Sequence, residues 1–231
     1  MNQNKQLVKT LKQVGFIHEM FRYVNKKIPN VLSIARENNL TIQEWVEKIE
    51  SDKTQQSVKI SVIVSDIIQE WIVFKANQFF QQKGIDYLSV IPFTENKLKW
   101  DDDKNFDVIF NYYGKSIRLE IKTSQSESSF TGATHGKNKV SDYLLINYRI
   151  DKSLKVQHSQ ENYFTSGVFA AIVTVKSDGF VGEASKKNSF TTFKFSKHSY
   201  SLDYINEHTL VGGIDNNKKT RKNHTLVLEK I

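Results

Sequence analysis

Three residues have types and a spacing that point to phosphoryl chemistry: Asp107, Glu120 and Lys122. They lie in residues 106–123, where two apolar runs rich in β-branched and aromatic residues flank the sequence Tyr113-Gly114-Lys115. Apolar runs separated by a short glycine-containing turn predict a β-hairpin. The hairpin would place the acid of one strand across from the acid and the lysine of the other.

Side chains alternate between the two faces of a strand, which separates the second run into two sets. Leu119 and Ile121 are expected to point into a core. Glu120 and Lys122 are expected to point the other way together, with Arg118 beside them. Charged side chains next to buried positions are costly unless they are paired or hold a ligand.

Asp107 is the acid of the facing strand, so Asp107 and Glu120 are expected to converge on one divalent cation with Lys122 alongside. A metal ion held by carboxylates can activate a water and stabilise charge on a phosphoryl group. The alternative is a surface hairpin with a Glu120–Lys122 pair, which would stabilise the fold by less than ~1 kcal/mol.

These residues also carry a resemblance to a known family. Asp107, followed by Glu120-Ile121-Lys122 at the end of the next strand, resembles the D…(D/E)-x-K signature of the PD-(D/E)XK nuclease superfamily. Phe106 stands where the family usually has proline. Residues 128–132, followed by residues 141–146, resemble type II restriction endonucleases, in which a glycine-containing loop leads from the catalytic lysine into the next core strand.

The resemblance covers roughly residues 61–175 and implies an α/β (α+β) fold, with a restriction-endonuclease-like central mixed β-sheet flanked by helices. It implies Mg²⁺-dependent, sequence-specific hydrolysis of double-stranded DNA by a cytoplasmic prokaryotic homodimer, alongside a methyltransferase that protects the host. Asp107, Glu120 and the Ile121 carbonyl would hold the metal, and Lys122 would orient or help deprotonate the attacking water.

Composition is compatible with this interpretation. The chain has 231 residues, of which 39% are hydrophobic, enough for one large domain with a core. It contains no cysteine, so a metal site would use oxygen or histidine ligands, which favours Mg²⁺. Lys and Arg outnumber Asp and Glu by 33 to 25, and the net charge of +8 favours polyanionic partners. No apolar run is long enough to span a membrane, so no membrane partner is expected.

The amino-terminal part is expected to be helical, with helices at residues 5–23 and 31–38 and a third opened by the capping box Thr41-x-x-Glu44. We assign residues 1–56 to a helical segment for dimerisation or DNA wrapping, and residues 57–231 to the nuclease domain.

Residues 31–50 also have the outline of a helix-turn-helix. A plain helical hairpin that packs on the main domain is favoured instead. The second helix carries Gln43, Glu44 and Glu47 where groove contacts would need basic residues.

A long helix is expected over residues 61–83, ending at Gly84. Its expected core stripe is Ile63, Ile67, Trp71, Phe74 and Phe79. Glu70 on this helix is a possible extra metal ligand, although a solvated or lysine-paired acid is the more common case. Strands are expected at residues 85–91, 141–151, 164–177 and 225–228.

Three polar stretches are candidates for DNA contact, because amide, hydroxyl and cationic groups read bases and hold phosphates. The first is an expected long loop over residues 124–140, and the others lie near residues 186–188 and 215–223, where a solvated charged turn is the alternative. The candidate residues are Gln125, Ser126, Thr131, Thr134, His135, Lys137, Asn138, Lys139, Lys186, Lys187, Asn188, Lys218, Lys219 and Arg221.

Two other functions compete with a restriction endonuclease. A repair or junction-resolving nuclease of the same superfamily would share the site but select DNA by shape. A non-catalytic DNA-binding regulator would use the helix-turn-helix outline. Discrete fragments from intact linear duplex would favour the restriction endonuclease over the repair or junction-resolving nuclease. Binding without cleavage would indicate the DNA-binding regulator.

Overall fold

The computed structural model describes most of the first two thirds of the chain and the paired strands of the last third. The described residues are 3–51, 59–91, 107–125, 129–133, 140–158, 160, 162–177, 190–194, 208–209, 213–215, 220–221 and 224–230.

Two helices open the chain where one was expected. α1 (Gln3–Gln13) and α2 (Phe16–Val31) are separated at Gly15, whose φ of 75° lies in the left-handed region that glycine adopts readily. The prediction of a single helix over residues 5–23 was therefore wrong. α2 continues through Pro29, and a short α3 (Ser33–Glu37) follows it.

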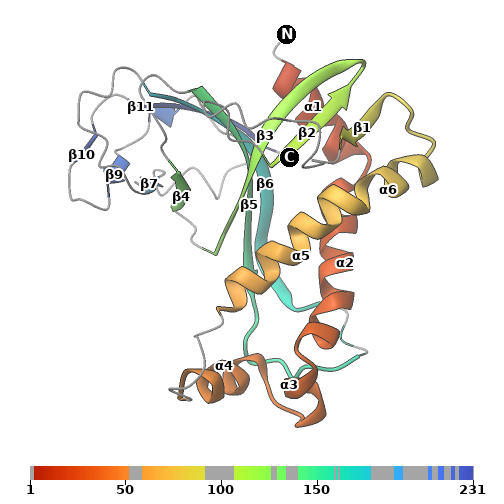
Figure 1. The fold of residues 1–231 in the computed structure, drawn as a ribbon, viewed down its shortest axis with the longest axis vertical. Helices are drawn as coiled ribbons and strands as arrows, with labels where there is room; N and C mark the ends of the chain where they lie inside the picture. The colour runs from red at the N-terminus through yellow and green to blue at the C-terminus, as the bar shows by residue number, and fades with distance from the viewer. Residues whose placement is uncertain are drawn as a thin grey trace, which may run out of the picture.

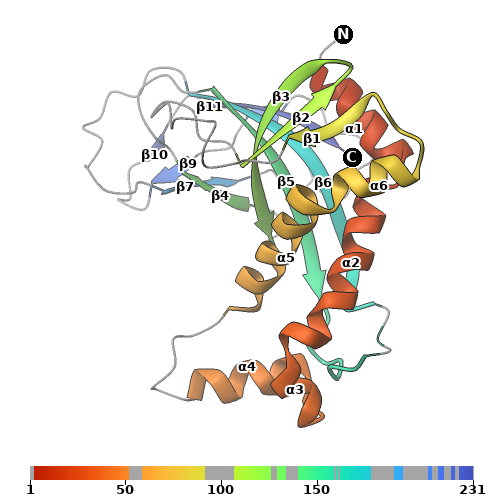
Figure 2. The same ribbon diagram turned by 45° about the vertical axis from the view of Figure 1, so that its right-hand side comes forward.

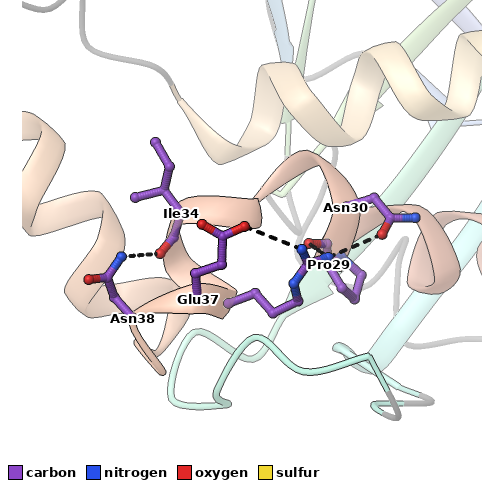
Figure 3. Close-up of polar contacts among 6 residues, drawn as sticks. Pro29, Asn30, Ile34, Glu37 and Asn38 are labelled. Atoms are coloured by element: carbon purple, nitrogen blue, oxygen red, sulfur yellow. Dashed lines mark hydrogen bonds and ion pairs between the residues drawn. The ribbon is translucent and has the colours of Figure 1, made fainter.

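Arg36 holds the corner between α2 and α3 with its side chain. Figure 3 labels Pro29, Asn30 and Glu37 at this corner. The Arg36 guanidinium donates to the Pro29 carbonyl at 3.1 Å and to the Asn30 side chain at 3.2 Å. It also lies 3.5 Å from a Glu37 carboxylate oxygen. The Asn38 side-chain amide donates to the Ile34 carbonyl at 2.7 Å, and the Asn38 backbone amide donates to the same carbonyl at 3.2 Å. Carbonyls near the ends of both helices thus gain side-chain partners.

The predicted capping box is confirmed at the start of α4 (Ile42–Ser51). The Glu44 carboxylate accepts from the Thr41 amide at 2.7 Å, and the Thr41 hydroxyl accepts from the Glu44 amide at 3.1 Å. Backbone hydrogen bonds from Ile42 to Leu154 and from Val156 to Leu40 dock this turn onto the segment that follows β5. The turn between α3 and α4 therefore packs on the rest of the molecule, as expected for a plain helical hairpin.

The expected long helix is two helices, α5 (Ile60–Phe74) and α6 (Ala76–Gln82), with the break at Lys75. Of the expected core stripe, Ile67, Trp71 and Phe79 are buried. Phe74 is 71% exposed, so its assignment to the core was wrong. Phe74 is the last residue of α5, whereas Phe79 lies beyond the break in α6.

A seven-stranded sheet forms the centre, in the order β1-β2-β3-β5-β6-β11-β8. Its strands are β1 (Leu88–Ile91), β2 (Val108–Tyr112), β3 (Lys115–Ser124), β5 (Val140–Ile150), β6 (Phe164–Ser177), β8 (His208–Thr209) and β11 (His224–Lys230). β3 and β5 pair in parallel, and the other strand pairs described in this sheet are antiparallel. The mixed sheet confirms the α+β class.

A second sheet has the order β10-β9-β7-β4. Its strands are β4 (Ser129–Ala133), β7 (Phe190–Lys194), β9 (Gly213–Asp215) and β10 (Thr220–Arg221). The expectation of one loop over residues 124–140 was therefore wrong where β4 forms. The partner of β4 is β7, about sixty positions further along the chain. A local sequence pattern does not predict so distant a pairing.

Figures 1 and 2 show α1, α2 and α5 gathered on one side of the large sheet, with the small sheet away from these helices. The helices and the sheet share one buried cluster. In it, the Phe16 ring centre lies 4.9 Å from Trp71, 5.8 Å from Phe80 and 6.0 Å from Phe110. Residues on both sides of the predicted boundary at residue 56 thus contribute to the same core.

Candidate active site

The predicted hairpin is confirmed as β2 and β3. Both turn residues have positive φ, 49° at Tyr113 and 75° at Gly114. This is the conformation of the tight turns that match the twist of paired strands, and glycine adopts it without strain. The turn sets the register that pairs Tyr112 with Lys115 and Val108 with Leu119.

The alternation expected along β3 is also present. Leu119 and Ile121 are buried in the cluster that the helices share with the sheet. Glu120 and Lys122 project from the opposite face, together with Arg118. Glu120 itself is only 6% exposed, a degree of burial that alternation alone did not predict.

Asp107 directly precedes β2. Its amide donates to the carbonyl of Leu119, the residue paired with Val108, at 2.9 Å, so the regular register of β2 and β3 does not extend to Asp107. The Ile121 amide donates to the Asp107 carboxylate at 2.8 Å. Asp107 therefore contacts the two residues that flank Glu120 in β3, and its carboxylate feels the charge of Lys122.

Desolvation is the main influence on the Asp107 carboxyl group, and it raises the pKa above the usual value for aspartate. The hydrogen bond from the Ile121 amide and the charge of Lys122 lower the pKa and oppose that effect. The residue as a whole stays exposed, which limits the effect of desolvation. A cation beside this carboxylate would favour its ionised form.

Lys122 forms an ion pair with Glu120 through Nζ and Oε1. The Lys122 side chain is 25% exposed and the Glu120 side chain is almost fully covered. This is therefore not the solvated surface pair of the alternative interpretation, because a covered carboxylate depends strongly on its counter-charge. The ion pair supplies the charge balance that the burial of Glu120 requires.

The donor set fits a hard divalent cation. In an antiparallel pair, the N–H and C=O of one residue face the same neighbour, so the Ile121 carbonyl lies on the edge of β3 toward Asp107. Two carboxylates and a carbonyl leave positions for water and phosphate oxygens, the arrangement that Mg²⁺ prefers. Within the described part of the chain, no group of three or more His, Cys, Asp or Glu side chains gathers to hold a metal.

Glu70 has other partners. The Tyr23 hydroxyl donates to its carboxylate at 2.6 Å, and the Lys27 ammonium lies 3.0 Å away. These contacts lower the pKa of Glu70, the Tyr23 hydrogen bond most strongly. α5 packs against the core face of β3, whereas Glu120 projects from the other face. The structure therefore does not bring Glu70 together with Asp107 and Glu120. Glu70 is instead an acid paired with a lysine, Lys27.

Few of the predicted DNA-contacting residues lie in the described part of the chain. The Gln125 amide is 3.5 Å from the Tyr148 hydroxyl, at the end of β3. Thr131 lies in β4 opposite Thr192, and Arg221 lies in β10 opposite Gly213. Outside the described residues are Ser126, Thr134, His135, Lys137, Asn138, Lys139, Lys186, Lys187, Asn188, Lys218 and Lys219.

The neighbouring strand adds side chains that sequence reasoning did not assign to the site. The parallel register places Tyr143 beside Glu120 and Leu145 beside Lys122. Both are buried, as is Asn147 two positions further on. Alternation within β5 could have grouped these three residues on one face. Their position beside the carboxylates follows only from the pairing of β3 with β5.

The fold and the site together define an α+β protein with paired carboxylates and a lysine on one face of a mixed sheet. No protein-family model, curated protein or solved structure matches the chain. No helix within the described residues is both long enough and apolar enough to cross a membrane.

Proposed function

We propose that the protein is a Mg²⁺-dependent endonuclease that hydrolyses double-stranded DNA at specific sequences, a type II restriction endonuclease of the PD-(D/E)XK superfamily. The observation that carries the proposal is the contact of Asp107 with the two residues that flank Glu120, together with the ion pair between Lys122 and Glu120. The net charge of +8 supports a nucleic-acid partner.

Each residue has a distinct role in this mechanism. Asp107 and Glu120 would hold the metal with the Ile121 carbonyl, and the ion would supply Lewis-acid stabilisation of phosphate charge. The hydrogen bond from the Ile121 amide keeps the Asp107 carboxylate in position. Lys122 orients the attacking water and offsets negative charge on the phosphate.

The fold is compatible with the restriction-endonuclease-like architecture. The site lies where β2 begins and where β3 runs in parallel beside β5 within the mixed sheet. A palindromic recognition site would call for a two-fold homodimer, formed through the amino-terminal helices or another surface. Such an enzyme would act in the prokaryotic cytoplasm beside a methyltransferase of the same specificity.

A digest tests the proposal directly. Incubation with a long duplex of known sequence should give discrete fragments in Mg²⁺ and none in EDTA. A smear would favour a less specific nuclease of the superfamily. Intact duplex with a gel shift would favour a DNA-binding protein without catalysis, and intact duplex without a shift would contradict both.

Asp107→Ala should abolish cleavage but preserve duplex binding in Ca²⁺, because it removes a metal ligand and leaves the cationic surface unchanged. Cleavage is followed by gel electrophoresis and binding by fluorescence anisotropy. Asp86→Ala is the matched control, since Asp86 is an exposed acid next to β1 and its loss should leave turnover unchanged. Turnover by Asp107→Ala close to that of the wild type would remove Asp107 from the site.

A further inference from the structure

Arg118 is an exposed cation on the same face of β3 as the candidate site. It lies two residues before Glu120 and pairs across the hairpin with Ile109. Ile109 in turn pairs with Ile91 of the edge strand β1. Arg118, Ile109 and Ile91 thus form a row across three strands, two positions along β3 from Glu120.

Exposure on this face differs between the two neighbours of β3. Beside Glu120 and Lys122, the β5 residues Tyr143 and Leu145 are buried. Arg118 itself is exposed, and so is Ile91 at the sheet edge, whereas Ile109 between them is buried. Arg118 is therefore accessible to a ligand that lies over β3 beside Glu120.

Cations beside the carboxylates would favour the binding of a polyanion, because Asp107 and Glu120 repel phosphate. Lys122 lies on one side of Glu120 along the strand and is in contact with it. Arg118 adds a positive charge on the opposite side of Glu120 along the strand. It would therefore attract the phosphate backbone on the side away from Lys122.

We propose that Arg118 binds the DNA phosphate next to the one that reacts, which holds the strand in register over Asp107 and Glu120. This rests on the proposed nuclease function. Alternate residues on a strand are roughly 6.7 Å apart, similar to the step between successive phosphates of one DNA strand. A guanidinium offers five donors and binds phosphate in a bidentate manner, so it can add a phosphate to any contact made within the protein.

The test is the salt dependence of duplex binding in Ca²⁺, where cleavage is blocked. One phosphate contact contributes about 0.9 to the slope of log affinity against log salt concentration. Arg118→Gln should lower the magnitude of the slope by about that amount, and Arg118→Lys should restore most of it. Lys115→Gln is the matched control, because Lys115 is an exposed cation in the hairpin turn, at the other end of β3, and should leave the slope unchanged.

The position of the contact is tested with a duplex that carries one neutral methylphosphonate beside the mapped cut. On this duplex Arg118→Gln should cause no further loss of affinity, because the contact is already absent. An additive loss would overturn the assignment to that phosphate. If the wild type binds and cleaves duplex and Arg118→Gln has the same slope as the wild type, the Arg118 proposal alone is overturned. A wild type that neither binds nor cleaves duplex would overturn the proposed function and the Arg118 proposal together.

Discussion

Glu120 is the residue on which the candidate site depends most, because it is a carboxylate that the fold almost fully covers. Alternation along β3 predicted the face from which it projects but not its burial. Lys122 compensates the charge in the protein itself. A metal ion at the site would place a second positive charge beside the same carboxylate, so Lys122 and the metal would share the neutralisation of Glu120.

Lys122→Ala should destabilise the protein by about 1–3 kcal/mol, because it leaves a covered carboxylate without its counter-charge. Urea unfolding measures the loss. Lys115→Ala, which removes an exposed lysine from the hairpin turn, should change the free energy of unfolding by less than ~0.5 kcal/mol. The double variant Glu120→Gln/Lys122→Ala should recover part of the loss, since no charge then remains uncompensated. A Lys122→Ala variant as stable as the wild type would contradict this account.

The same Lys122→Ala variant should not cleave duplex at a temperature where it remains folded. Its affinity for Ca²⁺ should be retained, because the carboxylates and the Ile121 carbonyl are still present. Isothermal titration calorimetry measures that affinity. Loss of metal binding together with cleavage would indicate that Lys122 maintains the shape of the site, and would argue against a role at the water.

At the scale of elements, α2 and α5 are joined by Tyr23, Lys27 and Glu70. The Tyr23 hydroxyl and the Lys27 ammonium both contact the Glu70 carboxylate, and Lys27 also lies 5.6 Å from the centre of the Tyr23 ring. Helical spacing on α5 alone left two roles for Glu70, a metal ligand or a paired acid. The packing of α2 against α5 places a lysine and a tyrosine beside it.

Glu70→Gln should weaken the pH dependence of stability in acid. The pKa of Glu70 is lowered in the folded protein, first by the Tyr23 hydrogen bond. The folded state therefore favours the ionised form, which contributes stability above the ordinary value of 4.5. This contribution disappears as the pH falls through the lowered pKa. Urea unfolding between neutral pH and acid should show a smaller loss for the variant.

Asp66→Asn is the control for this experiment, because Asp66 is an exposed acid on the same helix. It should retain the pH dependence of the wild type. Ca²⁺ affinity should be unchanged in Glu70→Gln. A tenfold or greater loss of metal affinity would instead return Glu70 to the metal site.

At the scale of the whole molecule, the amino-terminal helices are part of the core that supports the sheet. Phe16 is fully buried and contacts aromatic rings from α5, α6 and β2. The Thr10 hydroxyl and the Tyr112 hydroxyl form a buried hydrogen bond of 2.8 Å between α1 and β2. Loss of these helices would uncover the side of the sheet opposite the candidate site.

Phe16→Ala should lower the free energy of unfolding by about 3–5 kcal/mol, the usual cost of a large cavity in a packed core. Ile34→Ala is a matched control, because Ile34 is an exposed apolar residue in α3 and should cost less than ~1 kcal/mol. Both are measured by urea denaturation. A small effect of Phe16→Ala would show that residues 1–56 form a unit largely independent of the sheet.

The sequence by itself determined the features that depend on neighbouring residues. Alternation and the turn predicted the β2–β3 hairpin, and Thr41 with Glu44 predicted the capping box. The strands expected at residues 141–151 and 164–177 match β5 and β6 closely. The nearness of Asp107 to this part of β3 also follows from the local pattern, because a tight turn sets the register of a hairpin, but the shift of its amide to the Leu119 carbonyl does not.

Only the tertiary structure decided the features that depend on distant contacts. The burial of Glu120, the partners of Glu70 and the pairing of β4 with β7 all involve residues far apart in the chain or on different elements. The exposure of Phe74 belongs to the same group, since it depends on whether another element covers the last turn of α5. Periodicity reports which face a side chain occupies. Which other element covers that face depends on how the whole chain packs.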